Sequence, residues 1–286
     1  MNIGYKSALA VLPLLLSAAG QAQNNYNDVQ IKDTPLRGSV HMLQGAGGNI
    51  GVSAGKDGVL IIDDQFEPLA QKISNALGEL GNEAPKFIIN THFHGDHTGS
   101  NGWFHQHADS TIVAHNNVRV RLAKDNKTKP QALPVITYED GIKMHFNGET
   151  LHIMHLAEGH TDGDSVVWFE EPNVMHTGDL FFNERFPFID LKSGGSVDGY
   201  IRSVKQLIEK TNEQTIIVPG HGPLAKQSDY KAFLEMIEQT KSYVDKLKAQ
   251  GMSVEEIVEQ GLESKWQSWH WGFITEEKWI NTLYNG

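Results

Sequence analysis

A chain of 286 residues can bury a substantial core, and its 39% hydrophobic and 21% charged residues are ordinary for a globular protein. The formal net charge of −11 argues against nucleic-acid binding, because phosphate contacts need clustered lysine and arginine. The chain contains no cysteine, so disulfides are excluded, and stability must come from the core and from any bound metals.

The N-terminus has the pattern of a secretory signal peptide. Lys6 precedes an uncharged apolar run at 8–16, and small residues then lead to a cleavage site after Ala22. A membrane anchor is the alternative, but this run is shorter than the about 20 residues that a spanning helix needs. We therefore expect residues 1–22 to be removed, and residues 23–286 to form one periplasmic or secreted domain without stable membrane insertion.

The remaining chain alternates between strand and helix patterns. The polar segment 23–36 is predicted to be a loosely held leader. Apolar or alternating runs predict strands at 40–43, 50–52, 59–62, 86–90, 111–114, 142–146, 151–156, 165–169, 174–176 and 215–218. Helical spacing predicts helices at 66–80, 116–124 (with Asn116 as N-cap), 200–210, 229–250, 254–261 and 276–283. This order suits two sheets packed face to face with helices outside.

A cluster of histidines follows the strand predicted at 86–90. The segment 91–100 reads Thr-His-Phe-His-Gly-Asp-His-Thr-Gly-Ser. On an extended chain His92 and His94 point the same way, and a glycine-rich exit lets the backbone aim Asp96 and His97 from a second direction. Imidazole and carboxylate together suit a borderline divalent cation such as zinc. The motif therefore predicts half of a metal site.

Three later segments repeat one form, in which a strand ends at a glycine-flanked candidate ligand. They place His160 in Gly-His-Thr, Asp179 in Gly-Asp and His221 in Gly-His-Gly. Glycine beside a ligand lets the backbone approach a metal closely. Each segment alone is a weak signal, but together with the first motif they predict a complete site.

These four motifs, in this order, resemble the metallo-β-lactamase superfamily of binuclear hydrolases. The resemblance runs from about Val40 to His221. It implies a four-layer αββα sandwich of two mixed sheets flanked by helices, with two divalent metal ions at one edge. Carried over to this sequence, the first metal would be held by His92, His94 and His160, the second by Asp96, His97 and His221, and Asp179 would bridge them.

This ligand set indicates metal-assisted hydrolysis. Three neutral imidazoles suit zinc with an open position for water, whereas the carboxylate-richer second site could take zinc, manganese or iron. Two such cations would generate a bridging hydroxide near neutral pH and polarise a carbonyl. By its resemblance to family counterparts, Asp96 would orient that hydroxide as the catalytic residue. A small molecule is the expected substrate, and the oligomeric state is left open.

Two residue groups around these ligands leave alternatives. Asp63 resembles the family's second-shell aspartate, but it is equally suited to cap the helix predicted from Phe66. The other histidines are predicted to be non-ligands: His41, His105, His107, His115, His145, His152, His155, His176 and His270. His155 is the most tempting exception, but we expect it to face a strand neighbour.

The substrate is less constrained by the sequence. The β-lactamases of this superfamily with three first-site histidines mostly carry a second-site cysteine or lack the bridging residue, and the cysteine-bearing ones place a lysine three residues on. Here those positions are Asp179 and Phe182, which weighs against a dedicated β-lactamase. Asp179 makes the chain resemble glyoxalase II and lactonases instead, although the C-terminus has no evident basic cluster for glutathione. The segment 181–188 contains four phenylalanines and Arg185, and predicts either core packing or an apolar pocket with Phe182 and Arg185 contacting substrate.

Three functions therefore stay open. The leading one is an exported binuclear hydrolase of an ester, lactone, thioester or amide. The second is a β-lactamase, and the third, outside hydrolysis, is a diiron redox protein or a metal-binding accessory factor. The four tryptophans of the C-terminal region pose a similar choice between a pocket wall and helix anchoring, and anchoring is the default expectation: Trp266, Trp269, Trp271 and Trp279.

Overall fold

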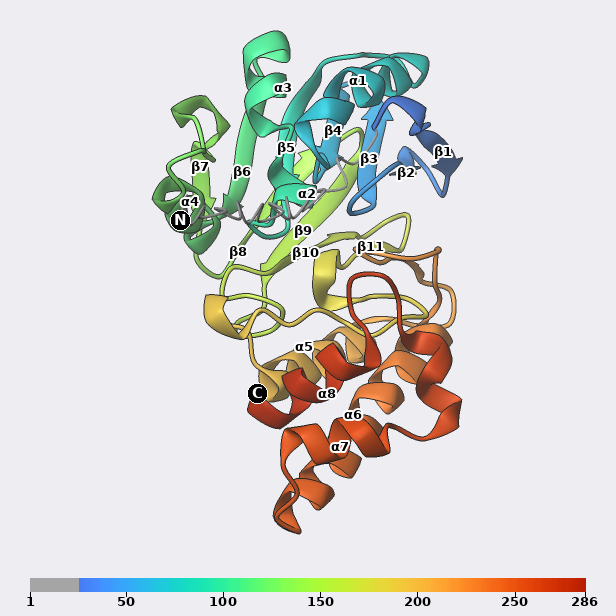
Figure 1. The fold of residues 1–286 in the computed structure, drawn as a ribbon. Coiled ribbons are helices and arrows are strands. Elements are labelled where there is room, and N and C mark those ends of the chain that lie inside the picture. Colours follow the sequence, from blue (N-terminus) through green and yellow to red (C-terminus); the bar gives the residue numbers. More distant parts are fainter. Residues whose placement is uncertain (1–25) are drawn as a thin grey trace, which may run out of the picture.

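The computed structural model describes residues 26–286, and these form four stacked layers (Figure 1). Helices lie above a seven-stranded sheet, a five-stranded sheet lies below it, and the C-terminal helices cover the far side of that second sheet. This arrangement is the αββα sandwich that was expected. The predicted signal peptide lies outside the described residues.

The first sheet and its helices come from the first half of the chain. Its strands pair in sequence order: β1 (Lys32–Pro35), β2 (Val40–Gln44), β3 (Ile50–Gly55), β4 (Gly58–Ile62), β5 (Pro85–Asn90), β6 (Thr111–His115) and β7 (Ile136–Tyr138). Its helices are α1 (Ala70–Glu79), α2 (Gly95–Thr98), α3 (Asn101–Ala108) and α4 (Asn116–Lys124).

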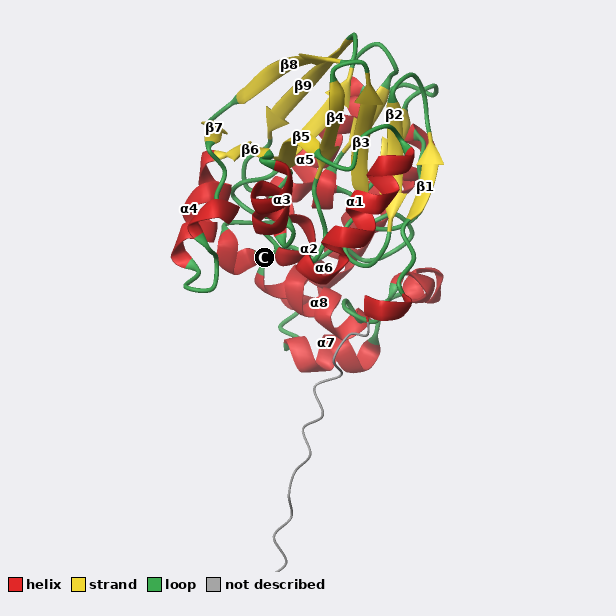
Figure 2. Cartoon of the chain, turned by 90° about the horizontal axis from the view of Figure 1, so that it is seen from above, coloured by secondary structure: helices red, strands yellow, loops and turns green. Residues whose placement is uncertain are grey.

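The second sheet has the order β12-β11-β10-β9-β8. Its strands are β8 (Gly141–Phe146), β9 (Glu149–His155), β10 (Ser165–Phe169), β11 (Val174–His176) and β12 (Ile216–Val218). The helices on its outer side are α5 (Val197–Lys210), α6 (Gln227–Ala249), α7 (Val254–Gln260) and α8 (Glu276–Asn285), together with the 3-10 segment η6 (Ser264–Trp269). In Figure 2, which views the molecule from above, the strands lie toward one end of the picture and α6, α7 and α8 toward the other.

Hydrophobic cores fill the spaces between successive layers, as the strand periodicity requires. On β4, Leu60 and Ile62 pack into the core between the sheets, whereas Val59 and Ile61 pack against the helices of the first layer. This strand is therefore buried on both faces, as its continuous apolar run predicts. A third core joins the second sheet to α5, α6 and α8, and Trp279 is fully buried in it.

The topology brings the ends of several strands to one edge. Strands β4 to β7 run parallel, and so do β11 and β12, with His176 opposite Val218 at their ends. Hydrogen bonds between segments from the two sheets hold this edge together: Ser165 N–H donates to the carbonyl of Thr91, and Asn49 N–H donates to that of Gly220. Ligands of α/β sheets tend to bind at the carboxyl ends of the strands, which is where the predicted metal motifs lie.

Several details differ from the sequence predictions. Residues 32–35 pair with β2 instead of forming a loose leader, because backbone pairing needs no apolar pattern at a sheet edge. The elements α3 and β7 were not predicted. The N-cap of α4 is His115, whose side chain accepts a hydrogen bond from Asn117 N–H, so the assignment to Asn116 was wrong. No helix in the described part is long and apolar enough to cross a membrane.

Candidate metal centre

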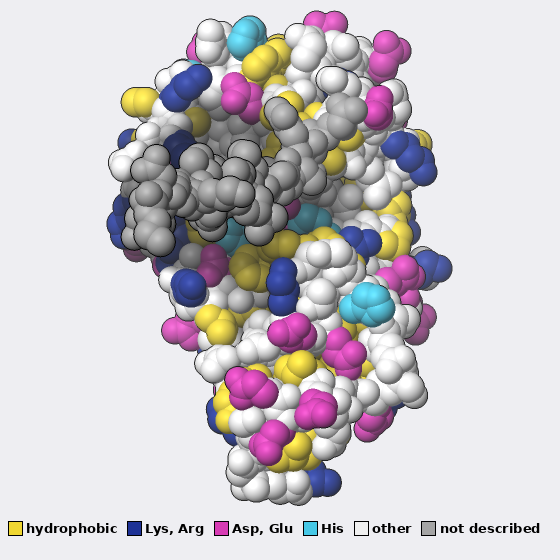
Figure 3. Space-filling view, in the orientation of Figure 1, with side chains coloured by type: hydrophobic (Ala, Val, Ile, Leu, Met, Phe, Trp, Pro, Cys, Tyr) yellow, Lys and Arg dark blue, Asp and Glu magenta, His cyan; other side chains and the backbone are white. Residues whose placement is uncertain are grey.

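Seven side chains predicted as ligands come together at this edge. Their ligand atoms form two groups, each with all atoms within 4.8 Å of one another: His92, His94, His160 and Asp179 in the first, and Asp96, His97 and His221 in the second. Both groups combine residues from segments that are far apart in the sequence. In Figure 3 histidine and hydrophobic side chains adjoin in the middle of one face, beside lysine or arginine atoms.

The first histidine motif turns by forming a helix. His94 is extended, with φ −65° and ψ 149°, and α2 begins at the next residue, carrying Asp96 and His97. Gly95 does not have positive φ, and a β-carbon there would meet nothing within 4 Å. The expectation that a glycine-rich exit supplies the turn is therefore wrong at this position, since a helical start redirects the chain without special backbone freedom.

Asp179 lies between the two groups and offers one oxygen to each. Its Oδ2 is 3.7 Å from His92 Nε2 and 3.5 Å from His160 Nε2. Its Oδ1 is 3.2 Å from His97 Nε2 and 3.4 Å from His221 Nε2. This is the arrangement of a carboxylate that bridges two cations.

The imidazole tautomers of the first group follow from their outer hydrogen bonds. His94 Nε2 lies 3.1 Å from Asp190 Oδ2, and His160 Nδ1 lies 2.7 Å from the carbonyl of Phe188. Both partners are acceptors, so these ring nitrogens carry the protons. The inner nitrogens, His94 Nδ1 and His160 Nε2, then present lone pairs to each other at 2.9 Å. Two lone pairs this close repel each other, so the arrangement is stable only with a positive charge between the two nitrogens.

Asp63 orients one imidazole of each group through a buried network. Its Oδ2 is 2.7 Å from His97 Nδ1, and it also accepts hydrogen bonds from the backbone and the hydroxyl of Thr91. Because that hydroxyl donates to Asp63, it accepts from His92 Nδ1 at 3.1 Å. The inner nitrogen of each of these rings is therefore Nε2. Asp63 therefore contacts His97. It does not cap the helix, because no side-chain hydrogen bond caps the N-terminus of α1.

The charges in the centre are unbalanced. Although burial opposes it, His97 and His221 hold the pKa of Asp179 well below its ordinary value. Burial also opposes protonation of His97, but Asp179, Asp96 and Asp63 raise its pKa well above the usual range. In the same way Asp179 raises the pKa of His221 to about 9 against the effect of burial. The carboxylates thus demand nearby positive charge, which bound cations would supply in place of protons.

Buried atoms without partners test whether metals fit. His92 Nε2, His97 Nε2 and Asp179 Oδ1 have no hydrogen-bond partner among the described residues, and all three face the centre. A buried polar atom without a partner costs free energy, so such atoms at one point indicate a missing ligand. The set of imidazole and carboxylate donors suits divalent cations, and the residues therefore fit two of them.

Two glycines allow the close approach that the sequence predicted near ligands. A β-carbon on Gly220 would collide with Oδ1 of Asp179, and one on Gly48 would collide with the ring of His97. Gly220 was recognised beside His221, but Gly48 was not singled out. Only glycine leaves these ligands room.

A cavity of about 710 Å³ opens beside the centre, lined by His94, Asp96, Asp179 and His221 and by aromatic rings. Both Phe182 and Arg185 line it, and the Phe182 ring stacks on His221 with centroids 5.0 Å apart. Phe181 and Phe186 are instead buried in the core of the C-terminal layer. The segment 181–188 therefore serves both predicted purposes, since its phenylalanines divide between core and pocket.

The tryptophans divide in the same way, whereas the remaining histidines lie outside the ligand groups. Trp279 anchors α8 as expected, but Trp271 lines the cavity. None of the histidines predicted as non-ligands belongs to either ligand group of the described chain. His155 stacks on His115 with ring centroids 3.8 Å apart. The main residue that the sequence analysis missed is Asp190, which has no local motif and reaches His94 only through the fold.

Comparisons with known proteins decide the family. The model of the metallo-β-lactamase superfamily matches residues 45–221, which is more than half of the chain. The chain belongs to the metallo-β-lactamase superfamily. It is a metal-dependent hydrolase with a candidate metal-binding cluster of histidines and aspartates.

Individual members of the superfamily agree with this placement. The chain is 26% identical over 224 residues to metallo-beta-lactamase IND-1 of Chryseobacterium indologenes, covering 74% of this chain and 89% of that protein. It is 27% identical over 191 residues to the probable metallo-hydrolase YqgX of Bacillus subtilis, covering 61% and 90%. A metallo-beta-lactamase structure from Pontibacter korlensis superimposes with a TM-score of 0.63 at 18% identity, covering 73% of this chain and 99% of that one, and shows the shared fold.

Proposed function

We propose that this superfamily member is an exported, binuclear, zinc-dependent hydrolase that cleaves an ester, lactone, thioester or amide bond in a small molecule. The observation that carries the proposal is Asp179, whose two oxygens each face a separate group of imidazoles. The first group would hold one zinc ion through three imidazoles. The second contains an aspartate as well, so manganese and iron are alternatives there.

When bound, the two cations would lower the pKa of water and polarise the scissile carbonyl. The protein's own contribution begins with Asp96, which lines the cavity and whose side chain is 25% exposed, against 5% for Asp179. Asp96 is therefore the carboxylate that can orient a water molecule in the cavity. Although burial opposes it, His97 and His221 hold the pKa of Asp96 below its ordinary value, which keeps it ionised for that role.

The second candidate is β-lactam hydrolysis. The similarity to IND-1 favours it, because that relative is named a metallo-β-lactamase. Phe182, however, is a buried ring stacked on His221 and offers no positive charge to a substrate carboxylate. We expect a measurable but weak β-lactam rate, below the about 10⁴ M⁻¹s⁻¹ of an efficient enzyme.

Export is proposed from the N-terminal pattern, with residues 23–286 as one catalytic domain after removal of residues 1–22. Cell fractionation and N-terminal sequencing of the mature protein test it. A protein that retains Met1 and stays in the cytoplasm contradicts export but leaves the hydrolase proposal untouched.

Metal analysis with a substrate panel tests the catalytic proposal. The expected result is two zinc ions per chain, hydrolysis of esters, lactones or thioesters, and loss of hydrolysis in His94→Ala. His145→Ala is the matched control, since this exposed histidine belongs to neither ligand group. Iron with a visible absorption band and no hydrolysis would instead support the diiron alternative, and a protein that binds metal but has neither property would support an accessory role.

A further inference from the structure

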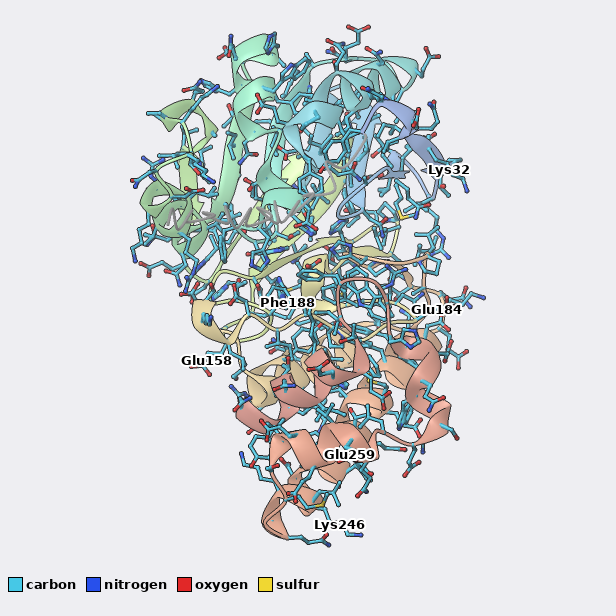
Figure 4. The ribbon with its side chains drawn as sticks, in the orientation of Figure 1. Lys32, Glu158, Glu184, Phe188, Lys246 and Glu259 are labelled. Carbon is cyan, nitrogen blue, oxygen red and sulfur yellow. The ribbon has the colours of Figure 1, made fainter. Side chains whose placement is uncertain are left out.

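The cavity beside the metal centre is walled largely by aromatic rings. Phe66, Phe182, Phe188, Trp271 and Phe273 line it together with the candidate ligands. Figure 4 places Phe188 near the middle of the molecule, between the sheets and the C-terminal helices. A volume of about 710 Å³ lies within the range of small-molecule sites, and aromatic walls favour an apolar, flat ligand.

Two of these rings come from the loop between η6 and α8, which rises from the C-terminal helices toward the sheets (Figure 1). Backbone and side-chain bonds tie the loop to the segment after β11: Trp271 Nε1–H donates to the carbonyl of Phe186, and Phe186 N–H donates to that of Trp269. Trp271 and Phe273 lie beyond residues 45–221, which the family model matches. These two rings therefore come from outside the segment that the family model matches.

Arg185 lies at the edge of the same cavity without an acidic partner. Its guanidinium carbon is 5.1 Å from the centre of the Trp271 ring, and no carboxylate of the described residues forms an ion pair with it. Glu184, its neighbour in sequence, is exposed and lies at the outer edge of the molecule (Figure 4). Burial lowers the pKa of Arg185, which reflects a desolvated cation.

Arg185 also connects the aromatic cavity to a second one. A space of about 490 Å³ shares Arg185, Gly47 and His221 with the first and is lined in addition by Lys32. Lys32 and Arg185 thus place positive charge in the second cavity, next to the aromatic one, although the net charge of the protein is −11. A half-buried guanidinium stacked on a ring offers a fork of donors that matches a carboxylate.

We propose that the site takes esters, lactones or thioesters of an aromatic acid that carries an additional carboxylate, with the ring under Trp271 and Phe273 and the carboxylate on Arg185. This inference rests on the proposed hydrolase function and names its substrate class. The aromatic walls favour a substrate with an aromatic ring. The guanidinium of Arg185, which forms no ion pair with a described residue, favours a substrate carboxylate.

Three esters with the same leaving group test the proposal. They are the 4-nitrophenyl esters of 4-carboxyphenylacetic acid, phenylacetic acid and acetic acid, and the release of 4-nitrophenolate reports kcat and KM. We expect kcat/KM to fall in that order for the wild type. In Arg185→Gln we expect KM for the carboxylated ester to rise about tenfold to a hundredfold more than KM for the neutral aromatic ester, as for loss of a charge-assisted hydrogen bond.

Matched controls separate this effect from general damage. Arg202→Gln removes an exposed arginine of α5 that pairs with Glu158 away from the cavity, and should leave all three esters unchanged. Trp271→Leu should raise KM for both aromatic esters about threefold to tenfold relative to the acetate ester, whereas Trp266→Leu, outside the cavity, should not.

A binding measurement keeps the inference separate from the hydrolase proposal. 4-Carboxyphenylacetamide carries the same ring and carboxylate, and its binding to the metal-loaded protein can be followed by tryptophan fluorescence. If none of the esters is hydrolysed but this amide binds and Arg185→Gln weakens its binding, the hydrolase proposal fails and the ligand class stands. If Arg185→Gln affects charged and neutral ligands equally, or the wild type does not prefer the carboxylated ones, the inference is overturned.

Discussion

The two halves of the metal centre are supported in different ways. The His97 half is held by Asp63, which is completely buried and bonded to Thr91 from a neighbouring strand end. The His94 half is held by Asp190, which lies on a loop and keeps 17% of its side chain exposed. A buried carboxylate within a hydrogen-bond network gives stronger orientation than a partly hydrated one. We therefore expect the two halves to differ in how tightly they hold a cation.

The largest effect should come from Asp179, the proposed shared ligand, because both halves depend on it. Asp179→Asn removes the negative charge that faces both halves, so both cations should bind more weakly and hydrolysis should fall by about 10³-fold. Metal stoichiometry after dialysis and steady-state kinetics measure this. A variant that keeps two cations and more than a tenth of the wild-type rate would show that the halves do not depend on Asp179.

Crowding of Asp179 from one side should have the next largest effect. In Gly220→Ala the new β-carbon would collide with Oδ1, the oxygen that faces the His97 half. Displacement of a reacting group by about 1 Å can cost about 10²-fold in rate, and we expect a loss of that order with weaker metal binding in the second group. Gly272→Ala, where a β-carbon would meet nothing within 4 Å, is the control.

Substitution of the two supporting carboxylates tests directly whether the His97 half and the His94 half are supported to different degrees. Asp63→Asn should weaken the cation of the His97 half and Asp190→Asn that of the His94 half, each by about tenfold to a hundredfold, with the larger effect for the buried Asp63. Competition with a chromophoric chelator resolves the two affinities. Equal losses at both halves from either variant would mean that the carboxylates stabilise the whole edge and not a particular imidazole.

The smallest effect should come from the stacked pair His115 and His155, which is linked to the His94 half by hydrogen bonds. His155 is bonded to the carbonyl of Asp164, and the carboxylate of Asp164 accepts from the N–H of Thr161, next to His160. Burial, with His155 stacked on it, lowers the pKa of His115 to about 4. The unfolded chain, with a histidine pKa of about 6.5, binds a proton at this position before the folded chain does, so His115 lowers the free energy of unfolding as pH falls from about 6.5 toward 4.

Thermal unfolding at a series of pH values tests this effect. The loss of stability between about pH 6.5 and 4 should be smaller in His115→Asn than in the wild type, and asparagine can still cap α4. His152→Asn, at a partly exposed histidine paired with Glu170, is the control and should follow the wild type. Parallel curves for all three proteins would show that His115 does not contribute to the acid response.

The sequence by itself determined the layers and the ligand types. Continuous apolar runs such as Val59–Ile62 identified strands buried on both faces, because side-chain alternation and burial are local properties of the pattern. The spacing of His92, His94, Asp96 and His97 indicated a candidate metal-binding cluster for the same reason. Each of these signals lies within a few residues of the chain.

Only the tertiary structure decided which residues meet. Asp190 reaches His94 across 96 residues, and Trp271 lies over Arg185 from a separate loop. The choice between a pocket and a core for segment 181–188, and between a helix cap and a histidine partner for Asp63, also depended on neighbours from other elements. Contacts between distant segments are set by packing of whole layers, and no local pattern records them.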